Sequence, residues 1–413
     1  MTLSLAWVGP WNEQSAIAAA GSYVVAALLD AGHQVEVVRT ETGEAALLPP
    51  RPTPAPVHPP GALATAEIAL AYDGAIVNLG NHYGFHGRVF EILAAVPAIA
   101  IAHDAWMEDF SSGWRAAGGA GRPKNLAIGG DDDTSPALTL LVALSCGAVV
   151  HAQHYLGRVS TACPGPVRLL PLPISFPSLP PPRAIGDSLT VATIGHANPN
   201  KRIREILKAL AASRRLRQRV RYWVIGPVEP AERARLTQFA NELGITEPRF
   251  TGYVSDKMLR ELLADVDVIT CLRNPILEGG SASLVLAMQS GRPTLVSDDG
   301  VYAEVPEEFV LKCQPGTEAL DVIRHLTWIL DCPGEARRMG EAAADYARRH
   351  HDPTAYATEL VSLLEMAIRA APIIMAARAM GRELADLGCQ TDDQALERMG
   401  SVLDTLFLGR HQR

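Results

Sequence analysis

The stretch from Asp267 to Asp299 reads DVITCLRNPILEGGSASLVLAMQSGRPTLVSDD and decides the fold. A short β-branched run at 266–269 is followed by a polar, glycine-rich turn, and apolar residues then recur at helical spacing until Gly291. This pattern predicts a strand, a turn, a helix and a second strand. In an open α/β sheet, ligands bind where the carboxyl end of a strand leads into a helix, because unpaired N–H groups and the positive end of the helix dipole lie there. The glycine-rich turn is therefore a candidate ligand site.

Length, composition and charge exclude several classes of protein. A chain of 413 residues is longer than a single core usually supports, so two domains are expected. With 48% hydrophobic and 20% charged residues, the composition is that of a soluble globular protein. A net charge of -8 disfavours nucleic-acid binding, which needs a basic surface. The six cysteines form no CxxC pair, which favours reduced cytosolic thiols and disfavours a zinc site.

The ends and connections of the chain support the same classification. The opening MTLSLAWVGPW has no basic region and predicts a first strand, not a signal peptide. No uninterrupted apolar run reaches the roughly 18 residues that cross a bilayer. The proline-rich segment 49–60 predicts a loop within a domain, and the segment 170–182 predicts an interdomain linker.

Strands and helices alternate through both halves, which predicts two doubly wound domains with parallel sheets and a cleft between them. The C-terminal portion reads as helix. Strands are expected at 3–8, 34–38, 74–78, 98–103, 148–151, 189–194, 222–225 and 249–250, and helices at 15–31, 203–214, 230–243, 257–263, 317–330, 335–349 and 353–371, with a last amphipathic stretch to about Leu408.

Histidines follow three predicted strands of the first half. One cluster contains Asn78, His82 and His86, a second is His103-Asp104, and a third is His151. Each histidine by itself can be read as a hydrogen-bonded loop residue. Three histidine-bearing strand ends in one domain favour a cleft, and their spacing matches no metal motif.

Two basic features of the second half have alternative readings. Lys201 begins a helix after a glycine-containing turn, so dipole, N–H donors and ammonium could hold a diphosphate there. On this stretch alone a solvated first-turn residue is the favoured reading of Lys201, and the P-loop spacing is missing. Five arginines between 214 and 221 suggest contact with anionic lipid, but a solvated helix end is favoured.

Several motifs together resemble retaining glycosyltransferases of family 4. In the second half these are GHANPNKR at 195–202, GYVSD at 252–256, LRNP at 272–275, and VSDDG followed by AEVP. VGPW, AGHQVEVV, LGNHYGFH and IAHD in the first half look like one branch of that family. The resemblance implies an α/β protein of the GT-B fold: two Rossmann-like doubly wound domains whose parallel sheets face across a cleft, with a helical C-terminal tail. The expected domains are 1–175 on the acceptor side, 176–365 for the nucleotide sugar, and 366–413 as a helical extension.

The resemblance also implies a donor site. Lys201 matches the lysine that binds the donor pyrophosphate, Glu278 the first glutamate of a paired motif that binds the transferred sugar, and 252–254 the turn that holds the base. Two positions depart from the family. His196 replaces an arginine, so binding of the donor phosphates is expected to be weaker or to depend on Arg202 or Arg273. Leu286 replaces the second glutamate, which normally holds the ribose. Glu304 is a weak candidate to replace that glutamate. The full donor-binding set is Gly195, His196, Lys201, Arg202, Gly226, Gly252, Tyr253, Val254, Arg273, Glu278, Gly279, Gly280 and Ser281.

The activity implied is transfer of a sugar from a nucleotide diphosphate sugar to an acceptor hydroxyl, with retention at the anomeric carbon and without a metal or other cofactor. The resemblance implies catalytic roles for His103, Asp104, Lys201 and Glu278. Acceptor contacts are expected in the first domain around the proline-rich loop, where the family resemblance is weakest, at Trp11, Asn12, Asn81, His82 and Tyr83. The expected partners are the donor and a carbohydrate, small-molecule or lipid-linked acceptor, in the cytoplasm, with peripheral contact at the inner membrane face left open. Two alternatives remain: a nucleotide-sugar 2-epimerase, and a non-catalytic nucleotide-sugar-binding partner subunit.

Overall fold

The computed structural model describes residues 2–118, 136–176 and 179–388, together with residues 398 and 400. The chain divides into two compact units. The first unit combines the chain up to His151, Tyr155–Leu170 and the residues from Thr354 onward, and the second combines Ala152–His154 with Pro171–Pro353. Cys389 and most of the stretch expected to be helical up to about Leu408 lie outside the described residues.

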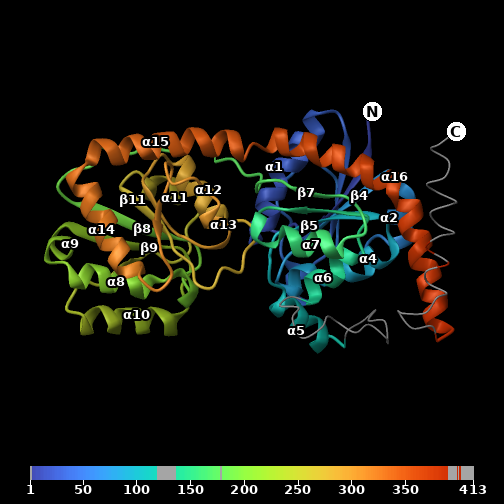
Figure 1. Cartoon of the computed structure of the whole chain (residues 1–413), viewed down its shortest axis with the longest axis horizontal. Coiled ribbons are helices and arrows are strands. Elements are labelled where there is room, and N and C mark those ends of the chain that lie inside the picture. Colours follow the sequence, from blue (N-terminus) through green and yellow to red (C-terminus); the bar gives the residue numbers. More distant parts are fainter. Residues whose placement is uncertain (1, 119–135, 177–178, 389–397, 399, 401–413) are drawn as a thin grey trace. The chain divides into compact units, whose positions relative to one another are not determined.

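The first unit is a parallel sheet with helices along it (Figure 1). Its described strands are β1 Ser4–Gly9, β2 Gln34–Arg39, β3 Val57–His58, β4 Gly74–Leu79, β5 Ala98–Ala102, β6 Gly147–Val150 and β7 Val167–Leu169. Its described helices are α1 Ala16–Asp30, α2 Thr65–Ala71, α3 Tyr83–His86, α4 Val89–Ala95, α5 Glu108–Ala116, α6 Pro136–Ala143, α7 Leu156–Ala162 and the long α16 Pro353–Asp386, with 3-10 turns at Gly43–Leu47 and Gln153–Tyr155.

The strand order of this sheet is β3-β2-β1-β4-β5-β6-β7, and each pair is parallel. The order reverses between β1 and β4, and the loops that follow strands at such a switch point frame the ligand crevice of doubly wound sheets. The strand β3 lies within the proline-rich segment 49–60. It is only two residues long and occupies the sheet edge, where missing proline donors are tolerated.

The helix α16 continues beyond its predicted end. Its predicted end was Ala371, directly before Pro372, and proline removes a helical hydrogen bond and clashes with the preceding turn, at a cost of ~3 kcal/mol. Leu360, Leu364 and Ile374 of α16 are buried in one apolar cluster with residues of α1 and the first sheet. Burying one such side chain contributes ~1.5–3 kcal/mol, so packing on both sides of the proline outweighs its cost. The residues from 354 to 365, expected in the second domain, therefore belong to the first unit.

The second unit repeats the architecture (Figure 1). Its described strands are β8 Leu189–Ile194, β9 Val220–Ile225, β10 Arg249–Phe250, β11 Val268–Cys271, β12 Thr294–Ser297 and β13 Leu311–Cys313, in the parallel order β10-β9-β8-β11-β12-β13. Its described helices are α8 Ile203–Ala212, α9 Arg214–Arg219, α10 Pro230–Glu242, α11 Asp256–Leu263, α12 Ala282–Gln289, α13 Gly300–Ala303, α14 Glu318–Asp331 and α15 Pro333–His350, with a 3-10 turn at Pro199–Lys201.

Apolar residues cover both faces of the second sheet, as expected for parallel strands. Successive side chains of a strand point to opposite faces. Leu189 and Val191 of β8 join one core with α8, α10 and α14, whereas Ala192 and Ile194 join another with α11, α12 and α15. The prediction of two Rossmann-like doubly wound units with a helical C-terminal region is confirmed.

The helical stretch Pro333–Asp386 contains an 18-residue window with a mean hydropathy of 1.8, of which 33% is buried. By length and composition alone such a helix could cross a membrane. No segment of this kind was expected from the sequence, because charged residues such as Glu365 and Arg369 interrupt the apolar residues of α16. The core helix of a soluble protein passes the same test, and α16 contributes buried leucines to the first core.

Candidate functional site

The candidate donor site lies at the carboxyl edge of the second sheet. The strand order places β8 beside β11, where the sheet reverses direction, so the turns that follow these two strands are neighbours. The backbone N–H of Asn274 donates to both the carbonyl and the side-chain oxygen of Asn200, each at 3.0 Å. This contact ties the turn after β11 to the turn after β8.

Two glycines shape the turn after β8. Gly195 has a φ of +96°, and a Cβ atom there would lie 2.9 Å from Nζ of Lys201. Gly226, which follows β9, has a φ of +137°, and a Cβ atom there would lie 2.5 Å from the carbonyl oxygen of Gly195. Only glycine combines such positive φ angles with this close approach. Both glycines therefore allow the backbone to close around the lysine side chain.

Lys201 is buried beneath this turn, with 6% of its surface exposed. Its ammonium donates to the carbonyl of Ile194 at the end of β8. Burial, reinforced by the positive charge of Arg273, lowers the pKa of Lys201 to about 7. Near neutral pH the ammonium is thus readily deprotonated, and an anion bound beside it would favour the protonated form.

Arg273 and Glu278 form an ion pair in the turn after β11. The guanidinium Nε lies 3.1 Å from Oε1 of Glu278, while Nη1 donates to the carbonyl of Leu272 at 2.8 Å and Nη2 to Oγ of Ser283 at 3.4 Å. Arg273 is 8% exposed and the side chain of Glu278 20% exposed. The pair is therefore preorganised while its carboxylate still reaches the surface.

Ser281 begins the helix α12 at the end of this turn. Its Oγ accepts a hydrogen bond from the N–H of Leu284 at 3.3 Å, which caps the helix. Gly279 is buried and Gly280 half-buried, so the backbone of the turn is packed closely. Polar donors, a capped helix N-terminus and two buried cations thus gather where the turns after β8 and β11 meet, an arrangement suited to an anionic ligand.

Tyr302 of α13 is a member of this cluster that sequence reasoning missed. Its hydroxyl lies 2.6 Å from Oε1 of Glu278 and 3.0 Å from Oγ of Ser281, and the residue is fully buried. Burial raises the pKa of Tyr302 well above its usual range, so the hydroxyl stays protonated and donates. The only sequence signal was its position just after the β12 strand end, between the VSDDG and AEVP motifs.

Two predicted donor residues, Arg202 and His196, are not buried in this cluster. Arg202 has a φ of +53°, and its Nε donates to Oε1 of Glu318 at 2.9 Å. Glu318 is 2% exposed, so this buried ion pair occupies the Arg202 guanidinium. His196 is exposed on the turn surface. Of the cations proposed to replace the family's arginine, Arg273 is therefore the one whose charge acts on Lys201.

The turn predicted to hold the base follows β10. Gly252 has a φ of +70° and forms an antiparallel bridge with Gly226, which brings this turn to the same sheet edge. Tyr253 is 81% exposed, and Val254 is half-buried. The exposed tyrosine ring offers a free apolar face beside the glycine turns.

Leu286, in the position of the family's second glutamate, is 4% exposed and packs in the core of α11, α12 and α15. A hydrocarbon side chain in this position accepts no hydrogen bond from a ribose. Glu304 does not replace it in the described contacts, because its carboxylate accepts from the N–H of His154 at 3.1 Å.

In the first unit, the predicted residues His103 and His151 form a buried chain with Asn78. His103 Nε2 lies 2.9 Å from Oδ1 of Asn78, His151 Nε2 lies 3.2 Å from Nδ1 of His103, and His151 Nδ1 lies 2.9 Å from the carbonyl of Leu170. The Asn78 amide nitrogen donates to the carbonyl of Val8 at 3.1 Å, which leaves Oδ1 to face His103. Both ends of the chain are therefore acceptors.

This row of hydrogen-bonding groups has one contact more than the protons of two neutral imidazole rings can fill. Neutral imidazoles supply two protons for three contacts, so a third proton, and hence a buried positive charge, would be needed to complete them. Burial lowers the pKa of His103 well below its usual range and that of His151 to about 4. Desolvation therefore keeps the pair neutral near pH 7. Both ring nitrogens of His103 face protein atoms, not open space.

Asp104 organises the loop that holds the predicted acceptor residues. Its Oδ2 accepts from the N–H of Asn81 at 2.8 Å, and Oδ1 of Asn81 accepts from the N–H groups of Asp109 and Phe110 at 2.9 and 3.2 Å. His82 is exposed, and the ring of Tyr83 lies 5.7 Å from that of Phe110. The exposed edge of this loop is thus formed by residues 81–83.

Trp11 and Asn12 have no exposed surface. The N–H of Trp11 and the side-chain amide of Asn12 donate to Oε1 of Glu41 at 2.9 and 3.0 Å, and Arg39 pairs with the same carboxylate at 3.1 Å. Sequence reasoning missed Arg39 and Glu41. These four buried residues stabilise the turn after β1 and offer no surface to an acceptor.

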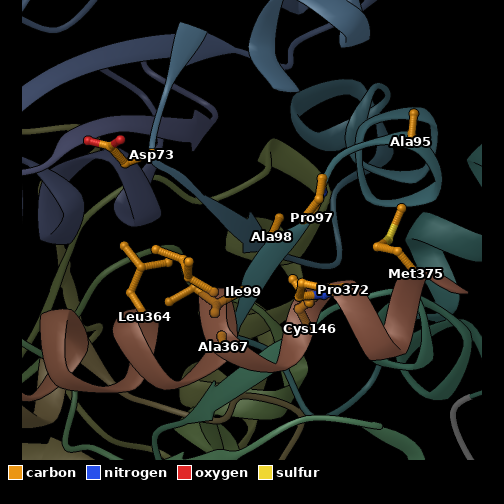
Figure 2. A pocket seen from close by; sticks show the side chains of 12 residues that line it. Asp73, Ala95, Pro97, Ala98, Ile99, Cys146, Leu364, Ala367, Pro372 and Met375 are labelled. Atoms are coloured by element: carbon orange, nitrogen blue, oxygen red, sulfur yellow. The ribbon is translucent and has the colours of Figure 1, made fainter. Parts of the chain in front are cut away.

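A cavity of about 510 Å³ lies at the opposite, amino edge of the first sheet (Figure 2). It separates α16 from the starts of β4, β5 and β6, and Figure 2 shows Leu364, Ala367 and Pro372 of the helix facing the strands. Its lining is mostly apolar, with Asp73 the charged exception. Because ligands of doubly wound sheets bind at the carboxyl edge, this cavity is not part of the candidate site.

Within the described ranges, no three His, Cys, Asp or Glu side chains are grouped as a metal site would require.

Residues 179–346 match the model of the family described as Glycosyl transferases group 1. These residues contain Lys201, Arg273, Glu278, Ser281 and Tyr302. The match lies within the second unit, which contains the candidate donor site. None of the curated proteins matches the chain.

Solved structures share the fold of the chain. HepE from Anabaena, in complex with UDP and glucose, has a TM-score of 0.62 at 15% identity, over 88% of this chain and 99% of that chain. Sucrose-phosphate synthase from Thermosynechococcus elongatus has a TM-score of 0.57 at 17% identity, over 87% and 98%. AviGT4, a glycosyltransferase involved in avilamycin A biosynthesis, has a TM-score of 0.55 at 17% identity, over 89% and 98%. The expectation of a GT-B glycosyltransferase fold is confirmed.

Proposed function

We propose that this protein transfers a sugar from a nucleotide diphosphate sugar to an acceptor hydroxyl, with retention of anomeric configuration and without a metal. The observation that supports this most is the cluster of Lys201, Arg273, Glu278 and Ser281 at the switch point of the second sheet, within the residues that match the glycosyltransferase family model. The cluster combines cations for a diphosphate with a carboxylate for sugar hydroxyls.

The two cations have a direct chemical use in this reaction. Departure of the nucleoside diphosphate leaves negative charge on a phosphate oxygen, and preorganised positive groups in a water-poor site stabilise that charge. Lys201 and Arg273 are both almost fully buried, so little solvent screens them. Their charges lower the barrier to leaving-group departure, and Glu278 orients the sugar by accepting hydrogen bonds from its hydroxyls.

The first unit contributes the acceptor side in this proposal. The exposed part of the loop at 81–83 is the surface available to a carbohydrate, small-molecule or lipid-linked acceptor. Asp104 holds that loop, and the neutral His103 lies behind it. Trp11 and Asn12 act only as support for the neighbouring turn. We place the reaction in the cytoplasm or at the inner face of the membrane.

The donor can be identified by incubating the protein with UDP-, GDP- and dTDP-sugars in a thermal-shift screen, because a ligand of the folded state raises its stability. HepE structures contain UDP-glucose or UDP with glucose, so UDP-glucose is the first donor to test. Turnover is then measured as nucleotide release and product formation with an acceptor panel, and the product anomer is assigned by NMR.

Matched variants test the site. Lys201→Ala and Glu278→Ala should each abolish transfer while the circular dichroism spectrum is retained. Arg273→Ala should weaken donor binding at least about tenfold, as expected for loss of a charged hydrogen-bonding group. Arg202→Ala should lower stability but leave donor affinity unchanged. If Lys201→Ala and Glu278→Ala both keep full activity, the assignment of the site is wrong.

The buried Leu286 favours a second candidate, a non-catalytic nucleotide-sugar-binding subunit. Without the second glutamate, the ribose loses a carboxylate acceptor, and binding depends on the phosphates, base and sugar. Donor binding without nucleotide release across the acceptor panel would support the subunit. Epimerised donor in reactions without acceptor would instead identify an epimerase.

A further inference from the structure

Tyr302 connects two segments of the donor site that are distant in sequence. It lies in α13, which follows β12, whereas Glu278 and Ser281 belong to the turn after β11. Its hydroxyl donates to Oε1 of Glu278 at 2.6 Å and lies 3.0 Å from Oγ of Ser281. The residue is fully buried, so its ring is fixed by packing and its hydroxyl has a defined position.

The two oxygens of Glu278 have different surroundings. Oε1 accepts from Tyr302 at 2.6 Å and from Nε of Arg273 at 3.1 Å. Oε2 accepts only the long bond from the N–H of Leu277, at 3.3 Å, among the contacts of the described residues. A carboxylate oxygen has two lone-pair sites. Oε1 is therefore satisfied within the protein, whereas Oε2 retains acceptor capacity at a side chain that is 20% exposed.

We propose that Tyr302 is a positioning residue: together with Arg273 it holds Oε1 of Glu278, so that Oε2 is presented to the hydroxyl groups of the transferred sugar. This inference rests on the proposed function. A partly exposed glutamate loses rotational freedom when it binds a ligand. Because Oε1 is already held, most of this freedom is lost before the sugar binds. It also makes the free oxygen a directed acceptor, and a site built to accept from a sugar hydroxyl rejects a ligand that lacks it.

The first test compares a ligand that carries the transferred sugar with the same nucleoside diphosphate without it. Isothermal titration measures the affinities of UDP-glucose and UDP, or of the donor that the screen selects and its free diphosphate, in wild type, Tyr302→Phe and Tyr222→Phe. Tyr222 is a matched control, because it is also buried in the second unit and its hydroxyl bonds Thr193 at 2.6 Å in the sheet core. Both variants lose one hydroxyl and keep the ring.

Tyr302→Phe should weaken UDP-glucose binding about tenfold, because the Glu278 carboxylate that binds the sugar loses a hydrogen bond. UDP binding should change little, because UDP has no glucose to contact Glu278. Tyr222→Phe should leave the ratio of the two affinities unchanged. A residue with a purely structural role would alter stability without altering that ratio. An unchanged ratio in Tyr302→Phe overturns the positioning role.

A ligand-free measurement separates this inference from the proposed function. In a double-mutant cycle, urea unfolding of Tyr302→Phe, Glu278→Ala and the double variant should show coupling of roughly threefold or more in the unfolding constant. The same cycle with Tyr222→Phe should be additive. Additivity for Tyr302 overturns the inferred contact whatever the ligand. If the cycle is coupled but wild type binds no nucleotide sugar, the proposed donor site fails, and the positioning role fails with it.

Discussion

Because Lys201 is buried, we predict that the affinity for the donor falls as the pH rises above neutrality. Its pKa is lowered to about 7 by burial and by the charge of Arg273. A diphosphate binds the ammonium form and raises the pKa of the bound lysine. The affinity is therefore highest below pH 7 and weakens as the pH rises above 7. The decline ends when the pH reaches the raised pKa of Lys201 in the donor complex.

The size of this effect follows from the fraction of protonated lysine. With a pKa of about 7, roughly nine-tenths of the free protein has charged Lys201 at pH 6 and roughly one-tenth at pH 8. Affinity should fall about tenfold over this range, or ~1.4 kcal/mol, and about tenfold more by pH 9. An unperturbed lysine, with a pKa of about 10.4, would give a flat profile over the same range.

UDP-glucose is the suitable ligand for the assay, because its diphosphate is esterified at both ends and does not gain a proton near pH 6, as a free terminal phosphate does. Isothermal titration from pH 6 to 9 at constant ionic strength gives the profile. Lys201→Met should bind weakly at every pH with no slope between pH 7 and 9, and His196→Ala should retain the slope. A flat wild-type profile, or a slope that persists in Lys201→Met, would refute the assignment of this lysine.

Three further predictions concern stability. Burial lowers the pKa of His86 to about 3 and that of His151 to about 4, so the unfolded chain binds more protons than the folded protein below pH 6.5. Between pH 7 and pH 5, the free energy of unfolding measured with urea should therefore fall by about 2 kcal/mol for each histidine. Replacement of either histidine by Asn should reduce this pH dependence. Leu286→Glu restores the family's glutamate but buries a carboxylate in the core, so we expect a loss of several kcal/mol in unfolding free energy and no gain in UDP affinity; tighter UDP binding would contradict this. Gly226→Ala would place a Cβ atom 2.5 Å from the Gly195 carbonyl at a φ of +137° and should destabilise the protein by at least ~1–3 kcal/mol, whereas Gly157→Ala, which meets no atom within 4 Å, should leave the melting temperature nearly unchanged.

Most strands and helices were predictable because their signals are local. The apolar run at 189–194 and the helix that begins at Ile203 differ little from their predicted bounds. The turn between them was recognisable as a site because Gly195 and Lys201 belong to a strand-to-helix transition, the usual place for anion binding in such sheets. Helix α16 was predicted too short, because the stop signal of Pro372 is local whereas the burial of Ile374 depends on the first sheet.

The distribution of roles among the site residues depended on contacts between distant positions. Arg202 and Arg273 were equivalent candidates to support Lys201 until the structure paired Arg202 with Glu318, 116 positions away. Tyr302 had no pattern of its own, and its hydroxyl acquires a role only because β12 lies beside β11.

The sequence by itself determined the two parallel sheets, the strand-to-helix turn that we propose as the ligand site, and the absence of a glutamate at position 286. These depend on the order of apolar, glycine and charged residues along the chain. Only the tertiary structure decided that Trp11 and Asn12 are buried supports, that Arg273 is the cation beside Lys201, and that Tyr302 and Arg273 share one oxygen of Glu278. The physical reason is that burial and hydrogen-bond partners are set by which strands become neighbours, a property of the whole sheet that no short stretch of sequence contains.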